Sequence, residues 1–327
     1  MFVENKVAII TGGATGIGYL YAVELLKNGL RAVVLADTNV TKGNEAVAQL
    51  TNEFGDDKAL FIKTDVTDRD QVENVFKQTV QRYQNIDILV NNAGILNESV
   101  WEKEIAINLN GTVYGCLLGM EEYLPKYRSE DEAVIVNISS IAGLDAFASS
   151  PVYTATKHAI IGLSRCLGTP DHYDTLKVRI LTICPGVTNT PLMENLGNKM
   201  FNERYTGVLT AIAKNGLPVA QNPEDVAQIL VKVIEKGSNG SFWIIEGGEL
   251  DEVEIPERNE LKKNNKRKAI YQTTPGTYRS VKSDNRKRWT PTRMPLLGTR
   301  AIVNQIPRDR LARTVGDPVE TPIRNHT

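Results

Sequence analysis

Residues 6–18 read KVAIITGGATGIG, and this stretch decides the fold of the chain. The β-branched run KVAII predicts a short strand that passes directly into a glycine-rich turn. A helical pattern follows and stops at Asn28-Gly29, and RAVVLAD then predicts a second strand that ends on Asp37. A strand, glycine-rich turn, helix, strand and terminal acid within about 30 residues are typical of a dinucleotide-binding βαβ unit.

Three glycines of this turn have distinct expected roles. Gly12 permits the tight turn, Gly16 lets the backbone approach a pyrophosphate, and Gly18 lets the helix pack closely on the strand. The start of the helix supplies oriented N–H groups for the phosphate charge. Thr15 and Ile17 lie in the same turn and are predicted to contact the cofactor with these glycines.

The acid that ends the second strand predicts which dinucleotide binds. A carboxylate at Asp37 can accept hydrogen bonds from ribose hydroxyls and would repel a 2′-phosphate. The neighbouring Thr38 and Asn39 offer no positive charge that would reverse this preference. The sequence therefore predicts NAD rather than NADP.

The alternation of strand and helix patterns continues to about residue 250. Helices are expected at 41–53, 69–83, 101–123 and 223–235, and SFWIIEGG (241–248) is expected to be the last strand. Strands that alternate with helices of this length indicate a parallel sheet covered on both faces. We therefore predict an α/β fold in which one doubly wound parallel sheet, a Rossmann fold, occupies residues 1–255.

Residues 137–157, NISSIAGLDAFASSPVYTATK, carry the predicted chemistry. Tyr153 and Lys157 are four residues apart, so on a helix they lie on one face. A nearby ammonium favours the phenolate and lowers the pKa of a tyrosine toward working pH. Ser140 follows the buried-strand pattern VIVNIS, where its hydroxyl can hydrogen-bond a substrate oxygen. These three residues predict a proton-transfer site.

Together these segments resemble the short-chain dehydrogenase/reductase family over about residues 3–250. TGGATGIG matches the family's cofactor turn, and Ser140, followed by two residues and a glycine, stands 13 residues before Tyr153, as in the family. The resemblance implies that Tyr153 is the general acid/base and that Lys157 also binds the nicotinamide ribose. It implies a fourth catalytic residue, Asn108, whose backbone holds a water that links the lysine to solvent. No metal site is expected, because the three histidines, His158, His172 and His326, have no ligand spacing.

The same resemblance implies further contacts with the cofactor. One pair is expected to contact the adenine. A second group forms the turn that supports the sheet and lines the cofactor, and a third segment binds the nicotinamide carboxamide. These residues are, in that order, Asp65 and Val66; Asn92, Ala93 and Gly94; and Pro185, Gly186, Val187, Thr188 and Thr190.

Within the family, three segments resemble both 15-hydroxyprostaglandin dehydrogenases and insect alcohol dehydrogenase-like enzymes: NESVWEKEIAINL (97–109), SPVYTATKH (150–158) and ICPGVTNTPL (183–192). Ser149 and Ser150 stand where the prostaglandin enzymes carry glutamines. Residues 191–217 are expected to form a substrate lid, which predicts an apolar secondary alcohol. Its apolar members are Leu192, Met193, Leu196, Met200, Phe201, Tyr205, Val208, Leu209 and Ile212.

Composition separates the end of this chain of 327 residues from the rest. Residues 256–327 hold 17 Lys and Arg against 6 Asp and Glu, although the net charge of the chain is −1. This basic, proline-containing tail is predicted to be disordered or extended. It can be a solvated extension with no role, or it can bind nucleic acid or an anionic membrane surface.

Two classes of function remain open at this point. The first is an NAD-dependent alcohol dehydrogenase, and the second is an NAD-binding protein that acts mainly as a scaffold through its tail. Three cysteines are too few for a disulfide framework, and neither a signal peptide nor a membrane span is indicated, which predicts a cytoplasmic protein. The family resemblance implies a homodimer or homotetramer that pairs through helices around 101–123 and 153–168.

Overall fold

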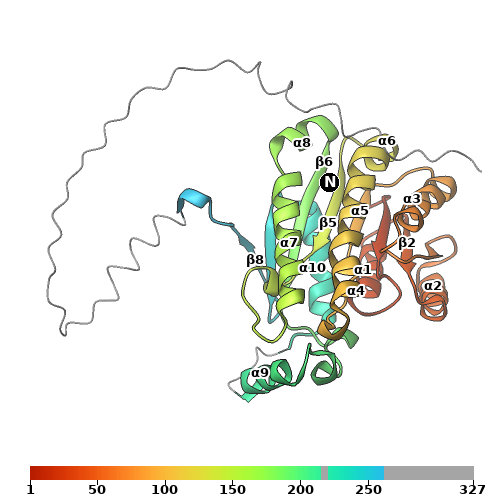
Figure 1. Ribbon diagram of the computed structural model, residues 1–327. Coiled ribbons are helices and arrows are strands. Elements are labelled where there is room, and N and C mark those ends of the chain that lie inside the picture. Colours follow the sequence, from red (N-terminus) through yellow and green to blue (C-terminus); the bar gives the residue numbers. More distant parts are fainter. Residues whose placement is uncertain (215–219, 261–327) are drawn as a thin grey trace, which may run out of the picture. The chain divides into compact units, whose positions relative to one another are not determined.

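A computed structural model describes residues 1–214 and 220–260. Its centre is one sheet in the order β3-β2-β1-β4-β5-β6-β7-β8, in which β1 to β7 pair in parallel (Figure 1). The order reverses between β1 and β4, the position where doubly wound sheets bind ligands beyond the carboxyl ends of their strands. The strands are β1 (Val7–Thr11), β2 (Ala32–Asp37), β3 (Ala59–Lys63), β4 (Ile88–Asn91), β5 (Ala133–Ile138), β6 (Val178–Pro185), β7 (Phe242–Glu246) and β8 (Glu249–Val253).

Helices connect these strands and cover both faces of the sheet (Figure 1). The helix predicted at 101–123 is present as one continuous helical path, and π-helical turns at Ala106–Asn110 and Leu118–Tyr123 interrupt it. The α-helices are α1 (Gly16–Lys27), α2 (Val40–Phe54), α3 (Arg69–Tyr83), α4 (Trp101–Ile105), α5 (Gly111–Leu117), α6 (Leu124–Tyr127), α7 (Pro151–Leu167), α8 (Pro170–Leu176), α9 (Glu203–Lys214) and α10 (Pro223–Lys236).

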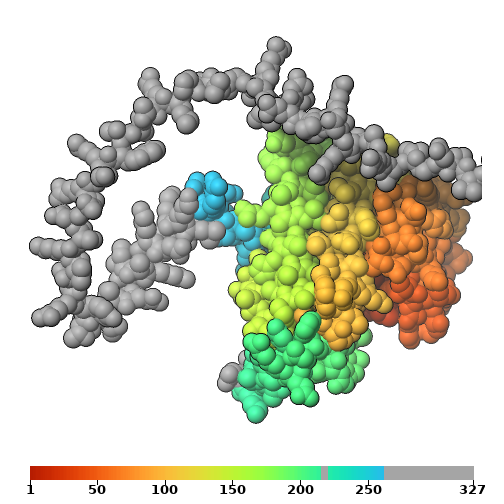
Figure 2. Space-filling view, viewed as in Figure 1, coloured from red at the N-terminus to blue at the C-terminus, as the bar shows by residue number. Residues whose placement is uncertain are grey.

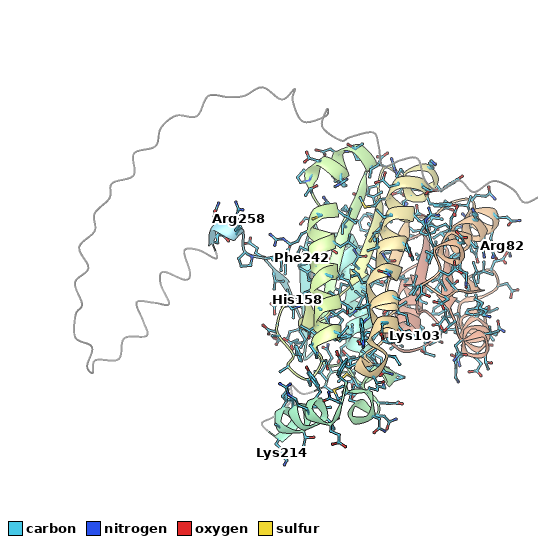
Figure 3. The ribbon with its side chains drawn as sticks, in the orientation of Figure 1. Arg82, Lys103, His158, Lys214, Phe242 and Arg258 are labelled. Atoms are coloured by element: carbon cyan, nitrogen blue, oxygen red, sulfur yellow. The ribbon has the colours of Figure 1, made fainter. Side chains whose placement is uncertain are left out.

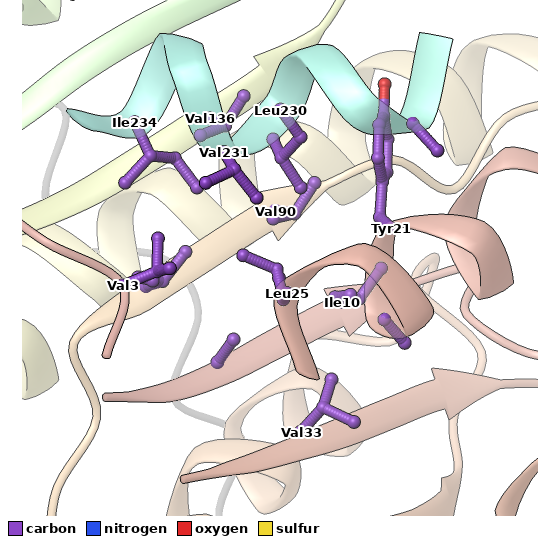
Figure 4. Close-up of a cluster of buried hydrophobic side chains, with 14 of the residues drawn as sticks. Val3, Ile10, Tyr21, Leu25, Val33, Val90, Val136, Leu230, Val231 and Ile234 are labelled. Carbon is purple, nitrogen blue, oxygen red and sulfur yellow. The ribbon is translucent and has the colours of Figure 1, made fainter. Parts of the chain in front are cut away.

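The central strands are buried on both sides because their side chains alternate between two cores. Ile10 and Val33 face the core formed with α1 and α10, where Leu25 and Leu230 also lie (Figure 4). Their chain neighbours, such as Ile9, enter the core on the other face with side chains of α3 and α5. This two-sided burial explains why these strands read as continuous apolar runs, and it confirms the predicted Rossmann-type α/β fold.

The strand predicted at residues 241–248 is present as β7, but the prediction that it is the last strand is wrong. Gly247 and Gly248 have φ values of +59° and +82°, a conformation that favours glycine and suits a two-residue hairpin turn. The chain therefore turns back, and β8 pairs antiparallel with β7. The sequence ELDEV hides this strand because it forms a charged edge and not a buried strand.

Several predictions concern residues that the structure does not describe. The basic tail from residue 261 onward and the end of the expected lid at 215–217 lie outside the described residues. The boundary near residue 255 stays a prediction. Across residues 1–214 and 220–260, no helix is both long and apolar enough to cross a membrane.

Candidate active site

A cavity of about 720 Å³ opens beyond the carboxyl ends of β1, β4, β5 and β6. Its wall brings together residues that the sequence scatters between positions 12 and 190. The predicted site residues that line it are Gly12, Thr15, Gly16, Ile17, Gly18, Asp37, Asp65, Asn92, Ala93, Gly94, Ser140, Tyr153, Lys157, Pro185, Gly186, Val187, Thr188 and Thr190. Two predicted residues, Val66 and Asn108, do not line it and are buried beside it.

The glycine-rich turn has the shape of a phosphate cradle. Gly12 and Gly16 have positive φ values of +63° and +59°. A Cβ on Gly16 would meet nothing within 4 Å, whereas a Cβ on Gly18 would collide with the Gly12 carbonyl oxygen. Thr15, the N-cap of α1, makes no side-chain capping bond to a described residue, and the first helical turn contains no acid. The helix N–H groups are thus available to an anion in the cavity.

Asp37 joins the turn to the end of β2. Its carboxylate accepts hydrogen bonds from the backbone N–H groups of Ala14 (3.2 Å) and Asn39 (2.9 Å), and it lines the cavity. Asn92 fixes the opposite side by donating to the carbonyls of Thr11 (3.0 Å) and Gly12 (3.2 Å). A free helix N-terminus, an open glycine cradle and an adjacent carboxylate fit a dinucleotide.

The proton-transfer residues come from α7 and from the loop after β5. The Lys157 ammonium donates to the Ile138 carbonyl (2.9 Å), and its Nζ lies 5.6 Å from the centre of the Tyr153 ring. The Ser140 hydroxyl accepts from the N–H of Ala142 (3.1 Å), which holds it at the cavity wall. A Cβ on Gly143 would come within 2.8 Å of the Lys157 carbonyl oxygen, so this glycine lets the loop lie against α7.

Burial is the largest cause of the pKa shifts of both Tyr153 and Lys157. Burial raises the pKa of Tyr153 to about 12; the Ser140 hydrogen bond opposes this rise and Glu104 adds to it. Burial lowers the pKa of Lys157 to about 8, while Cys184 and Glu104 act in the opposite direction. The predicted lowering of the tyrosine pKa by Lys157 is therefore absent in this structure, because desolvation disfavours the charged form of each group.

Asn108 acts as a brace and does not face the cavity. Its side chain exchanges hydrogen bonds with the backbone of Ile95, accepting from the N–H (2.8 Å) and donating to the carbonyl (2.9 Å). The side chain also donates to the hydroxyl of Thr156 on α7 (3.2 Å), while the backbone carbonyl of Asn108 accepts from the Thr112 hydroxyl (2.9 Å). The turn after β4 is thereby tied to the helix of Tyr153. The water-holding role of the Asn108 backbone stays a prediction.

Two glutamates that sequence reasoning missed are buried beside this group. Glu98 and Glu104 have no exposed surface. Glu98 accepts from the N–H groups of Val152 (3.2 Å) and Tyr153 (2.9 Å), and Glu104 accepts from the N–H of Asn97 (3.4 Å). In the sequence ESVWEKE both glutamates resemble solvated helix surface. The one local signal is that Glu104 lies four residues before Asn108, on the same helical face.

Replacing Glu104 with glutamine is expected to stabilise the protein increasingly as pH rises from about 4.5 to about 7. Burial, followed by the charge of Glu98, raises the pKa of Glu104 from 4.5 to about 7. Between these values the folded protein keeps a proton that the unfolded chain has lost, so this carboxyl makes stability fall as pH rises to about 7. The unfolding free energy of the variant minus that of the wild-type protein should therefore be roughly 2 kcal/mol larger at pH 8 than at pH 4.

Urea unfolding of the wild-type protein and Glu104→Gln across this pH range measures the difference directly. The exposed neighbour Glu102, changed to glutamine, serves as the matched control and should show no such trend. A stability difference that stays constant with pH would contradict a raised pKa at Glu104.

The other end of the cavity is mainly apolar. Leu192, Met193, Leu196, Leu209 and Ile212, all in the expected lid, line it. In Figure 2 the green segment that contains α9 lies against one end of the molecule. The other four apolar members of the expected lid do not line the cavity. Met200 is buried, Phe201 is 49% exposed, and Tyr205 and Val208 are half-buried.

Two lysines add positive charge to this apolar end. Lys103 of α4 (labelled in Figure 3) lines the cavity, as does Lys199, which donates to the Leu192 carbonyl (3.1 Å). Phe147, Ser149 and Ser150 also line this cavity.

Comparison with known proteins places the chain in a family. The profile of the short chain dehydrogenase family matches residues 6–200. The chain belongs to this family. It is 38% identical to 15-hydroxyprostaglandin dehydrogenase [NAD(+)] of Rattus norvegicus, over 75% of this chain and 92% of the relative. It is 32% identical to alcohol dehydrogenase 1 of Ceratitis cosyra, over 77% of this chain and 96% of that protein.

Two solved structures share the fold of this short-chain dehydrogenase. Levodione reductase superposes with a TM-score of 0.64 at 26% identity, over 76% of this chain and 98% of that one. L-sorbose reductase from Gluconobacter frateurii, complexed with NADPH and L-sorbose, gives 0.62 at 26% identity, over 76% and 97%. The similar proteins therefore include one named for NAD(+) and one that holds NADPH. The preference of this chain depends on its own residues.

Proposed function

We propose that this short-chain dehydrogenase interconverts an apolar secondary alcohol and its ketone with NAD, and that Tyr153 is the general acid/base. One observation carries the proposal: Tyr153, Ser140 and Lys157 line the same cavity as the glycine-rich turn and Asp37. A reacting carbon held between the two groups of residues would lie beside both a proton acceptor and a dinucleotide.

The side chains divide the work of alcohol oxidation. Ser140 hydrogen-bonds the substrate oxygen and stabilises the charge that develops on it. The Tyr153 phenolate takes the hydroxyl proton and returns it in the reverse reaction. The buried Lys157 lies beside the ring, where its charged form would favour the phenolate, although burial outweighs this effect in this structure. When bound, NAD⁺ supplies the hydride acceptor and a positive ring that also favours the phenolate.

The remaining predicted residues would hold the cofactor. The turn at residues 12–18 and the start of α1 suit the pyrophosphate, and Asp37 suits the ribose hydroxyls. Asp65, which lines the same cavity, would contact the adenine. Residues 185–190 would hold the carboxamide, where Gln221 fixes Thr188 through a hydrogen bond of 3.2 Å.

The wall beyond Tyr153 supports an apolar substrate, and Lys103 and Lys199 favour one that also carries a negative group. The rival scaffold reading would gain support from a broken catalytic set, whereas this chain keeps Asn108, Ser140, Tyr153 and Lys157. We also expect self-association through the helices around 101–123 and 153–168, where Trp101 and Leu117 are exposed.

Purified protein is expected to reduce NAD⁺ in the presence of an apolar secondary alcohol. The measurement is NADH absorbance across a panel that runs from short secondary alcohols through isoprenoids to hydroxylated fatty acids and their neutral esters, with NAD⁺ and NADP⁺ in parallel. If the two lysines bind the substrate, hydroxylated fatty acids should be oxidised faster than their neutral esters. Cofactor binding without turnover on any alcohol would contradict the substrate class, and absence of cofactor binding would contradict the whole proposal.

A further inference from the structure

The helix that carries Tyr153 lacks a cap of its own. Ser150 is the N-cap residue of α7, and its side chain makes no capping hydrogen bond to the described residues. Pro151 follows at the first helical position and has no N–H to satisfy. The first N–H groups of the helix that need a partner from outside it are thus those of Val152 and Tyr153, to which an N-cap side chain normally bonds.

Glu98 serves both of these donors from a distant part of the chain. Its two carboxylate oxygens accept from Val152 (3.2 Å) and Tyr153 (2.9 Å), across 54 and 55 residues of sequence. A negative charge at a helix N-terminus is favourable, and charge-assisted hydrogen bonds are short and strong. One of the two bonds ends on the backbone of Tyr153 itself, so Glu98 holds the first helical turn in place.

Glu104 lies close enough to complicate this arrangement. One of its oxygens accepts from Asn97, the neighbour of Glu98, and the other has no hydrogen-bond partner among the described residues. A buried carboxylate with an unpartnered oxygen is costly, and two nearby carboxyls rarely ionise together. The protonated form of Glu104 removes both penalties.

We propose that the buried Glu98 caps α7 through the N–H groups of Val152 and Tyr153 and thereby positions Tyr153. In this proposal Glu104, whose second oxygen lacks a partner among the described residues, is the carboxyl that keeps a proton. Glu98 is a positioning residue and does not touch the cavity. The catalytic consequence rests on the proposed role of Tyr153, whereas the capping role does not.

Ionisation of Glu104 would also make proton transfer by Tyr153 depend on pH. The ionisable groups coupled to Glu104 are Glu98 from the loop before α4 and Tyr153 and Lys157 from α7. The exposed Glu102 and Lys103 of its own helix lie outside this set. Ionisation of Glu104 would add a second negative charge that opposes formation of the phenolate.

Hydrogen exchange and kinetics on three variants test this proposal. Glu98→Gln keeps the shape of the side chain but presents an amide N–H₂ to one of the two helix donors. We expect exchange in the peptide 151–157 to become roughly 10-fold faster, and kcat to fall about 10-fold or more because Tyr153 is displaced. The Kd for NAD⁺ should change less than 2-fold from the wild-type value. Glu104→Gln and the control Glu102→Gln should keep wild-type exchange.

A second-site change tests whether capping itself is responsible. Ser150→Asp in the Glu98→Gln background places a carboxylate at the N-cap position and should restore slow exchange in 151–157. Glu104→Gln should raise alcohol oxidation relative to the wild-type protein above pH 7 and leave it unchanged at pH 6.

Wild-type exchange in Glu98→Gln, or equal effects of the Glu98 and Glu104 changes, would overturn the proposal. If Tyr153→Phe kept full activity, the proposed function would fail, while the exchange experiment would still decide the capping role.

Discussion

Tyr153→Phe should lower kcat for alcohol oxidation by about 10³-fold, within the range that general acid/base groups contribute. The change removes only the phenol oxygen, whose described neighbour is the Ser140 hydroxyl. The ring stays buried between the loop after β5 and the cavity, so the fold and the cofactor turn should be preserved. The Kd for NADH, measured by fluorescence titration, should match that of the wild-type protein.

The matched control is Tyr173→Phe. That hydroxyl donates to Glu132 (3.1 Å) and does not line the cavity, so its removal should leave kcat unchanged. Because burial raises the pKa of Tyr153 to about 12, oxidation by the wild-type protein should keep rising with pH through the alkaline range. Residual activity above a tenth of wild type in Tyr153→Phe would mean that another group transfers the proton.

Features set by local spacing could be predicted from the sequence. The glycine turn is one case, because Gly12, Gly16 and Gly18 act within a single strand–turn–helix unit whose geometry follows from their spacing. Tyr153 and Lys157 are another, because four residues on a helix place them on one face. Ser140 joined them because the carboxyl end of a buried strand must lie at the ligand edge of a parallel sheet.

Features that depend on long-range packing could not be predicted. The bond from Glu98 to the N–H of Tyr153 joins residues 55 apart, and nothing in ESVWEKE distinguishes a buried glutamate from a solvated one. The direction of the pKa shift at Tyr153 was predicted wrongly for the same reason. The sequence shows the nearby lysine but not the burial that outweighs it. The edge strand β8 was missed because its charged residues lack the apolar pattern of a core strand.

Asp37→Asn is expected to reduce the preference for NAD⁺ over NADP⁺ by about 10- to 100-fold, since one like-charge contact near a protein surface is worth roughly 1–3 kcal/mol. The asparagine keeps the size of the side chain and one acceptor oxygen for the N–H of Asn39 or Ala14. It removes the charge that would oppose a 2′-phosphate. The measurement is the pair of Kd values by calorimetry, which needs no knowledge of the alcohol.

We attribute the preference for NAD⁺ to the charge of Asp37 and not to negative charge elsewhere in the cavity. The variant Asp65→Asn tests this distinction. Asp65 also lines the cavity, and its carboxylate already accepts from the N–H and hydroxyl of Thr67 (2.9 and 2.8 Å). Its neutralisation should shift both affinities together and leave their ratio unchanged. Adding Thr38→Arg to Asp37→Asn supplies a guanidinium for the phosphate and should reverse the preference. If the wild-type protein bound both cofactors equally, the NAD assignment would be wrong, although the proton-transfer site could still operate with either dinucleotide.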